Sequence, residues 1–493
     1  MDQQQQQRAS SKGHARTSSG ARSERVDLPF PLQSQTLPFR RVACRNYHRL
    51  VYCVTDMFGW LAARPRSATK GPLDADEAPP LKSPIVSQVS RALSPQVGRG
   101  SRTSSPFARS PIRSRSSTPL GTAPLGVRDF SHLLRPEIFH QLSPLSIPPP
   151  FRNTAKQPTP ETPISELLAH GHFRAAAIAS VQALTSSPVS ATIAAAHPPV
   201  EPTDYARVFS LLYIRLACLC LIDSVPLAAQ EAKALEDLNQ VYYLDPMTGA
   251  HLMPWELRLL AIRLQTLGFG DPRRAIMSYY DMAREAHLQI AKAAKAHEHT
   301  ELELWKRRLA ELGVKVGGAL IEMEDLAGAA AHMATLRDQT QDGKLATAKA
   351  LLWLHLGDVD AACRCVRDGK GGEVGEEVVL ALVDMANGHF EDGLKKWTEL
   401  KAALEEKGIQ DEMVGVNLAV CLLYLGRMQE GRRILEDLVD EGQSSRTLLF
   451  NLSTMYELCT DRAKALKARL ADRVANLEPS SHGWEKTNAD FKL

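Results

Sequence analysis

Two closely spaced cysteine pairs, Cys218/Cys220 and Cys363/Cys365, come nearest to a metal-ligand pattern in this chain. Cysteine thiolates are common zinc ligands, so the spacing needs a structural test. Both pairs lie in segments of helical period, where side chains two residues apart point about 200° away from each other. The two thiols of a pair therefore cannot bind one ion, and we expect them to be small apolar packing residues.

Three histidines, His287, His297 and His299, form a second candidate metal set. They fall on a charged helical surface, and His297 and His299 face apart for the same geometric reason. The string GKGG at 369–372 follows a predicted helix rather than a strand, so it does not fit a phosphate loop. The sequence has no G-x-S-x-G, H-E-x-x-H or kinase motif set. We therefore predict no catalytic, cofactor-binding or metal-binding residue.

The elements that carry these residues have helical periodicity from Ile164 onward. Strings such as LLYIRLACLCLI and LAVCLLYLG place apolar residues at intervals of three and four. No sustained alternating run bounded by hairpin turns occurs, so we expect almost no strand. The folded part is predicted to be all-α.

A repeated pattern links the helices. Eight turn-like residues end successive apolar helices, and each is followed five positions later by a small residue. The turn residues are Gly171, Asp223, Gly270, Glu324, Gly357, Gly388, Gly426 and Thr460. The small residues are Ala176, Ala228, Ala275, Ala329, Ala362, Gly393, Gly431 and Ala465. A small side chain lets two helices cross closely, so we predict that each marks a helix–helix contact.

The spacing of these turns indicates the type of repeat. The last four separations are 33, 31, 38 and 34 residues, close to the period of about 34 in tetratricopeptide (TPR) repeats. The first three, 52, 47 and 54 residues, require inserted loops and longer helices, the latter around 276–312. We predict a TPR-like solenoid of about eight helix–turn–helix units.

The domain boundaries follow from these patterns. Irregular repeats are expected over 161–312 and regular ones over 313–478, with a C-terminal tail over 479–493. Residues 129–160 read as an amphipathic segment followed by a stiff Pro-rich connector at 148–150, which docks on the following repeats or on a partner.

Residues 1–128 differ in composition from the rest. Residues 1–125 carry 19 Lys/Arg against 7 Asp/Glu, a balance of +12, whereas the remainder carries −9. The Ser-, Pro- and Arg-rich stretches cannot bury enough apolar surface to fold, so we expect disorder. Five Ser/Thr-Pro pairs are candidate phosphorylation sites: Ser83, Ser94, Ser105, Ser110 and Thr118.

The basic segment has two interpretations. It is either a solvated linker or a phosphorylation-switched tail that contacts acidic lipid headgroups or an acidic partner. No nucleic acid is expected as a partner, because no folded RNA-reading module accompanies the Arg-Ser run. The apolar stretch 42–62 is an interfacial segment, a short packed helix, or a stretch that is not natural coding sequence.

The composition indicates in which cellular compartment the protein is found. The sequence has no uninterrupted apolar run of transmembrane length and no apolar core of a signal peptide near its start. Eight scattered cysteines do not suggest a disulfide framework. A cytoplasmic protein is therefore expected.

Two asparagines, Asn417 and Asn451, occupy equivalent positions of helices 34 residues apart. Equivalent helix faces in such solenoids line the concave groove, so these side chains are candidate contacts to a partner protein. The alternative is that they only bond neighbouring backbone.

Several strings resemble a known family. They are DFSHLLRPEIFHQLSP (129–144), GHFRAAAIASVQAL (171–184), LDPMTGAHLMPWELRLLAIRLQTLGFGDPRRAIMSYYDMAREA (244–286), DEMVGVNLAVCLLYLGRM (411–428), LFNLSTMYELCTDRAKALK (449–467) and GWEKTNADFKL (483–493). On these strings residues 129–493 resemble the subunit 12 family of the trafficking protein particle (TRAPP) complex, in a fungal-type form. Residues 1–128 contribute nothing to the resemblance.

The resemblance implies a non-catalytic scaffold subunit of a vesicle-tethering complex that acts as exchange factor for a Rab-type GTPase. It implies roles in ER-to-Golgi transport and autophagy, a location at early Golgi membranes, and other TRAPP subunits as partners, including the large ones of the third TRAPP form. The GTPase would be contacted only indirectly. The alternative is a TPR adaptor or co-chaperone, which generally needs a cluster of Lys/Arg with Asn on one concave face.

Overall fold

The computed structural model describes residues 128–185, 198–337, 344–368 and 373–493. The apolar stretch 42–62 lies outside the described residues, as do the five candidate phosphorylation sites, Ser83, Ser94, Ser105, Ser110 and Thr118. None of the helices in the described part is long and apolar enough to cross a membrane.

The described residues form eight antiparallel helix pairs, which confirms the predicted all-α helical repeat. In chain order the pairs are α4 (Ile164–Ala169) with α5 (Phe173–Leu184), α7 (Tyr205–Leu221) with α8 (Val225–Ala232), α9 (Trp255–Phe269) with α10 (Pro272–Ala296), α11 (His299–Glu322) with α12 (Leu326–Thr335), α13 (Lys344–Leu356) with α14 (Val359–Asp368), α15 (Glu373–Asn387) with α16 (Phe390–Glu405), α17 (Glu412–Tyr424) with α18 (Met428–Asp440), and α19 (Arg446–Cys459) with α20 (Ala463–Ala475). Strands are absent from the described part of the chain, where Leu244 and His251 form an isolated bridge.

The turn inside each of the first seven pairs has the same backbone geometry. The predicted turn residues from Gly171 to Gly426 all have φ between +59° and +85°. Five of them are glycines, which adopt this conformation without steric cost, whereas Asp223 and Glu324 do so as non-glycine residues. In each case the second helix begins two residues later. A residue in the left-handed conformation thus ends the first helix and reverses the chain, so that the second helix runs antiparallel to the first.

The small residues of these seven pairs stand at the fourth position of the second helix, and all seven are buried. They are Ala176, Ala228, Ala275, Ala329, Ala362, Gly393 and Gly431. The approach is close: a Cβ added at Gly431 would lie 3.0 Å from the carbonyl oxygen of Ala419 on α17. A larger side chain has no room at this crossing.

The eighth position differs. Ala465 is exposed, so the expectation of a buried contact there is wrong. The cause lies in the turn: Thr460 is extended (φ −163°) instead of left-handed, and α20 begins three residues after it. This shifts the register of α20, which buries Leu470, Ala471 and Val474.

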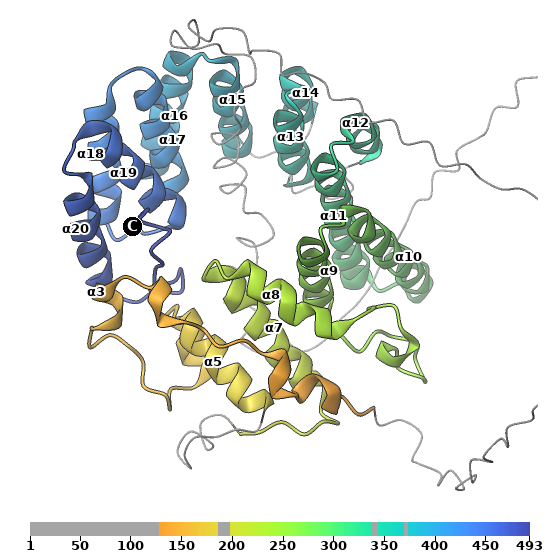
Figure 1. Cartoon of the computed structure of the whole chain (residues 1–493). Coiled ribbons are helices and arrows are strands. Elements are labelled where there is room, and N and C mark those ends of the chain that lie inside the picture. The colour runs from red at the N-terminus through yellow and green to blue at the C-terminus, as the bar shows by residue number, and fades with distance from the viewer. Residues whose placement is uncertain (1–127, 186–197, 338–343, 369–372) are drawn as a thin grey trace, which may run out of the picture.

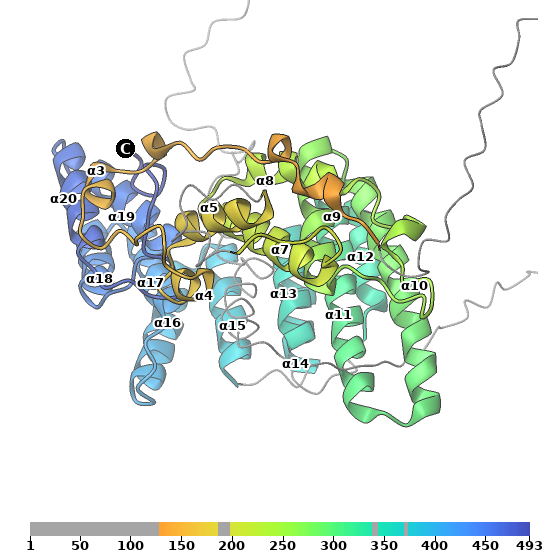
Figure 2. The same ribbon diagram turned by 90° about the horizontal axis from the view of Figure 1, so that it is seen from below.

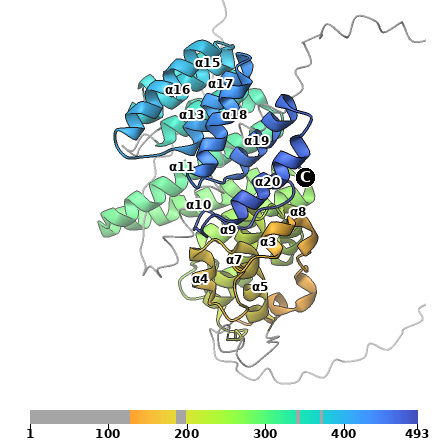
Figure 3. The ribbon, with the colours of Figure 1, turned by 90° about the vertical axis from the view of Figure 1, so that its left-hand side faces the viewer.

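The pairs follow one another around a ring (Figure 1). From α5 the chain passes through α7–α8 and α9–α10 and returns through α17–α20. The last pair thereby comes back to the short helix α3 (Pro149–Arg152) at the start of the described chain, and α20 contacts α3. Figure 3, seen from this side, shows α3 between α20 and α5.

The Pro run at 148–150 does not form the stiff polyproline connector that the sequence suggested. Pro148 precedes α3, and Pro149 and Pro150 are its first two residues. Proline is favoured there because its fixed φ suits a helix and its missing N–H would have no partner in the first turn. The short helix buries Phe151.

The two longest helices of the described chain are α10 and α11, with 25 and 24 residues. They account for the extended helices expected around 276–312. Their joined ends extend past α9 (Figure 2).

Candidate functional site at the ring closure

The cysteine pairs are packing residues in the described structure. Cys218 and Cys220 lie on α7, where burial raises the pKa of the Cys218 thiol far above its usual range and that of Cys220 to about 12. Such thiols stay protonated at neutral pH and are poor metal ligands. Cys363 and Cys365 are half-buried on α14. The described residues contain no cluster of His, Cys, Asp and Glu suited to a metal ion.

The three histidines do not come together either. His287 is half-buried on α10, where burial lowers its pKa. His297 ends α10 in a left-handed conformation (φ +56°), and His299 begins α11; both are exposed. His297 and His299 therefore mark the turn of the α10–α11 hairpin.

The two asparagines have different surroundings. Asn417 is buried on α17, and its Nδ2 donates a hydrogen bond to the carbonyl oxygen of Met413 at 2.9 Å. A buried amide that bonds its own helix cannot contact a partner, so the groove prediction is wrong for Asn417. Asn451 is half-buried on α19. Its proposed contact to a partner stays a prediction.

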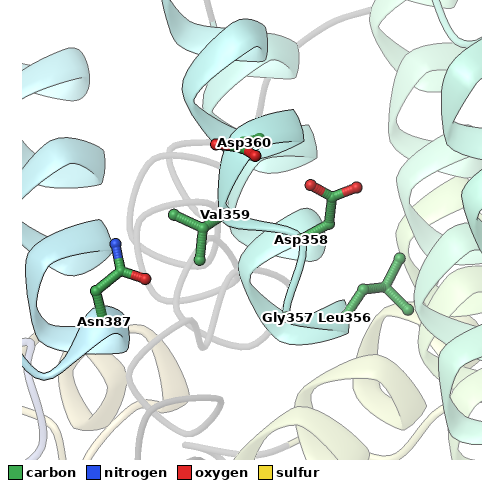
Figure 4. Close-up of a pocket in the computed structure, with 6 residues that line it drawn as sticks. All are labelled: Leu356, Gly357, Asp358, Val359, Asp360 and Asn387. Carbon is green, nitrogen blue, oxygen red and sulfur yellow. The ribbon is translucent and has the colours of Figure 1, made fainter.

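A shallow hollow lies at the turn between α13 and α14, beside the end of α15. Its lining is Leu356, Gly357, Asp358, Val359, Asp360 and Asn387. Figure 4 shows Asn387 and Asp358 on opposite sides of Val359. The Asp358 carboxylate accepts a hydrogen bond from the backbone N–H of Ala361 at 2.8 Å, which caps α14. The polar groups of the hollow do not converge, so we assign no ligand to it.

Residues 128–152, here called the strap, contact distant parts of the chain at three points. Its first anchor is Phe130, which is fully buried. The Phe130 ring meets those of Phe209 and Tyr242 edge to face, both at a centroid distance of 5.0 Å. Its backbone N–H donates to the carbonyl oxygen of Pro202 at 2.9 Å. The strap thus begins against the second helix pair.

The second anchor is a buried ion pair. Arg215 on α7 bonds Glu231 on α8 through two nitrogens, at 2.9 and 2.6 Å, and both side chains are almost completely buried. The same pair holds the backbone of His140 in the strap. Glu231 accepts from the N–H of His140 at 2.9 Å, and Arg215 donates to its carbonyl oxygen at 2.7 Å.

The third anchor joins the strap to the C-terminal residues 476–493, here called the tail. Phe151 of α3 packs edge to face on Trp484 at 5.4 Å, and its ring centroid is 6.2 Å from that of Phe491. All three side chains are buried in one cluster with residues of α17, α18, α19 and α20. The backbone N–H of Asn488 donates to the carbonyl oxygen of Ser146 at 2.8 Å.

The tail also contacts the first helix pair directly. The N–H of Trp484 donates to the carbonyl oxygen of Gly171 at 3.3 Å. Arg174 on α5 pairs with Glu485 at 2.5 Å, with both side chains largely buried. A Cβ at Gly171 would lie 2.2 Å from the carbonyl oxygen of Ser480, so only glycine fits there. Arg446 on α19 adds an ion pair to Asp223 in the turn of the second pair.

Strap and tail together close the solenoid into a ring. Sequence reasoning predicted that the amphipathic segment docks, but not that it spans from the second pair to the last. The sequence predicted a C-terminal tail over 479–493 but no contact for it. Two large aromatic residues, Trp484 and Phe491, in an otherwise polar C-terminal stretch are the signal that could have indicated burial there.

Comparison with curated proteins found two related sequences. Trafficking protein particle complex subunit 12 of Homo sapiens is 25% identical over 305 residues, which cover 55% of this chain and 41% of the human protein. Its counterpart of Mus musculus is 24% identical over 318 residues, 58% of this chain and 39% of the mouse protein. The chain is a distant homologue of TRAPP subunit 12. It spans about two fifths of the length of these curated relatives.

Among solved structures, a tetratricopeptide repeat protein of Parabacteroides merdae matches with a TM-score of 0.30 and 14% identity. The match covers 54% of this chain and 90% of the bacterial one. No family model matches the chain.

Proposed function

We propose that this protein is a non-catalytic scaffold subunit of a TRAPP complex. The observation that carries the proposal is the homology to subunit 12 of two mammals. Stacked helix pairs offer extended surfaces that commonly bind other proteins. This geometry suits a subunit that holds others together.

The ring closure supports a rigid scaffold. An open solenoid bends easily, because its contacts are all between adjacent repeats. Here the strap adds long-range contacts from Phe130 at the second pair to Phe151 at the last one. Because its first and last helix pairs are joined, the solenoid holds its partner-binding surfaces in one fixed arrangement. Less conformational entropy is then lost when the partners bind.

The expected partners are other TRAPP subunits, in particular the large ones of the third TRAPP form. The chain would contact the Rab-type GTPase only indirectly, since exchange would be carried out by other subunits. We place it in the cytoplasm at early Golgi and ER–Golgi intermediate membranes, where it would support ER-to-Golgi transport and autophagy.

Affinity purification of the tagged full chain from its own cells, followed by mass spectrometry, tests this proposal. Recovery of TRAPP subunits at levels comparable to the chain is expected. Recovery of heat-shock chaperones instead would favour the co-chaperone alternative and overturn the scaffold role. The burial of Asn417 argues against that alternative, because a clamp for acidic chain ends generally needs such an amide exposed.

A further inference from the structure

Helix α10 exposes three large hydrophobic side chains. Met277 is 61% exposed, Tyr280 43% and Leu288 67%. Soluble proteins expose single hydrophobic residues routinely, but several on one face mark a binding surface more often. Whether these three side chains form a binding surface therefore depends on whether they share one face of the helix.

The three side chains share one face of α10 with three cations. Positions 273, 277, 280, 284, 288 and 295 fall within an arc of about 80° on a regular helix. This stripe reads Arg273, Met277, Tyr280, Arg284, Leu288 and Lys295. It runs about 33 Å along the helix, at 1.5 Å per residue. Apolar and positively charged side chains thus share one exposed surface, the α10 stripe, with the small Ala291 between Leu288 and Lys295.

Other second helices of the repeats provide an internal comparison. Among their described residues, α14, α16, α18 and α20 expose no large hydrophobic side chain. The outer faces of α16 and α18 carry charged residues such as Glu399 and Arg433. The α10 stripe is therefore not a general consequence of the repeat architecture. It belongs to the helix that extends past its neighbour α9 (Figure 2).

The positive charge of the stripe indicates which kind of partner would bind it. The acidic residues of α10 are Asp281 and Glu285, and both are engaged: Asp281 by Arg284 and Asn239, Glu285 by Arg258. The charge of Arg284 is therefore shared with Asp281, and the exposed Arg273 and Lys295 give the stripe its positive charge. A second copy of the chain would bring the same cations face to face, which is unfavourable. Negative charge beside apolar side chains on the partner would complement the stripe.

We propose that the α10 stripe is a docking site for an acidic amphipathic helix of another protein. Apolar side chains of that helix pack on Met277, Tyr280 and Leu288, and its carboxylates pair with Arg273 and Lys295. The proposal goes beyond the scaffold role and does not require that the partner be a TRAPP subunit.

Site-specific photocross-linking in the complex purified from cells tests this proposal. Benzoylphenylalanine replaces Tyr280 or Leu288 in the full chain, and the cross-linked peptide is identified by mass spectrometry. The matched control carries the same group at Ala468, an exposed residue of α20. We expect Tyr280 and Leu288, but not Ala468, to cross-link to one segment of another polypeptide, rich in Asp and Glu with apolar residues at helical spacing.

Two variants add a quantitative test. Met277→Ser/Leu288→Ser and Arg273→Glu/Lys295→Glu should each lower recovery of the cross-linked partner roughly tenfold or more. Ala468→Ser should leave recovery unchanged, and all variants should keep the wild-type melting temperature because the substituted residues are exposed. Vesicles containing phosphatidylserine should bind the wild type and Met277→Ser/Leu288→Ser equally.

Several outcomes would overturn the proposal: cross-links to a basic or neutral segment, to this chain or a second copy, to lipid, or none above the Ala468 control. Loss of vesicle binding in Met277→Ser/Leu288→Ser would assign the stripe to a membrane instead. Failure of the proposed function can be told apart from failure of the docking site. If no TRAPP subunit co-purifies but an acidic helix still cross-links, the scaffold role is wrong and the docking site is retained.

Discussion

Arg215 and Glu231 form a buried ion pair that holds the strap by both backbone polar groups of one residue, His140. Glu231 accepts from the N–H of His140, and Arg215 donates to its carbonyl oxygen. Because charge-assisted bonds are stronger than neutral ones, the pair is a firm attachment point. The pair also fixes how α7 packs against α8, because any other packing of the two helices would leave a buried charge without its counter-ion.

Removing one partner of this pair should destabilise the protein strongly. We expect Glu231→Gln to lower the free energy of unfolding by about 3–5 kcal/mol, because it leaves the Arg215 charge buried and uncompensated. Urea denaturation followed by circular dichroism measures the change. The control is the half-exposed pair of Arg263 and Glu322, where Arg263→Ala should cost less than about 1 kcal/mol. Equal losses in the two variants would contradict the burial of the first pair.

A double replacement separates stability from strap attachment. Arg215→Met/Glu231→Leu should recover most of the stability lost in Glu231→Gln, because it removes both charges and keeps apolar volume. The strap should nevertheless exchange its amide hydrogens faster in a peptide spanning 136–147, since His140 loses both partners. Unchanged exchange in that peptide would show that the ion pair does not hold the strap.

Closure by the tail predicts unequal effects of two glycine substitutions. Gly171 and Gly270 have nearly equal φ values, +71° and +66°, so alanine at either should cost about 1–2 kcal/mol of backbone strain. Only at Gly171 does the added Cβ also meet the tail, whereas Gly270 has open space. We therefore expect Gly171→Ala to be the more destabilising and to make the tail sensitive to protease. Similar melting temperatures and intact tails in both variants would argue against the closure.

The helix crossings predict where added volume is tolerated. Ala275→Leu and Ala362→Leu should each cost about 1–3 kcal/mol, because both residues are buried at close crossings. Ala465→Leu is the control, since Ala465 is exposed and should accept the larger side chain with little change. Thermal unfolding of the three variants measures the difference. If Ala465→Leu were as unstable as the other two, the register assigned to α20 would be incorrect.

His251 should make stability depend on pH. Its Nδ1 accepts from the N–H of Met253 and its Nε2 bonds the carbonyl oxygen of Leu238, an arrangement that requires the neutral ring. Burial, and then the charge of Arg258, lower its pKa to about 4. The unfolded chain, with a pKa near 6.5, binds the proton first, so stability should fall as pH drops from about 6.5 towards 4.

Urea midpoints at pH 7 and pH 5 measure this dependence. His251→Gln should show a smaller loss between the two values than the wild type, whereas His299→Gln, at an exposed position, should match the wild type. Parallel losses in all three proteins would exclude His251 as the cause.

Local features of this fold were predictable from the sequence because short-range rules determine them. Gly171, Gly357 and Gly426 each follow an apolar helix and precede a small residue by five positions, and the structure has the expected turn at each. Thr460 matched the spacing but not the geometry. A left-handed backbone costs a β-branched residue more than it costs glycine, asparagine or aspartate, so residue type was the better guide at that turn.

The ring closure could not be predicted because it depends on curvature accumulated over eight pairs. Nothing local to Phe151 or Trp484 specifies that they meet, since more than 300 residues separate them. The small-residue pattern and the helix boundaries are local, whereas the partner of the strap is defined only once the whole solenoid has formed. The stripe on α10 was missed for another reason: a helical period shows which residues share a face, but not which face a neighbour covers.

Native mass spectrometry of the complex purified through the tagged chain tests the central claim most directly. If the protein is a scaffold subunit, the intact mass should correspond to a fixed number of copies of this chain together with TRAPP subunits, in one reproducible stoichiometry. An intact mass equal to that of this chain alone would contradict the account. TRAPP subunits present only in trace and variable amounts would contradict it as well.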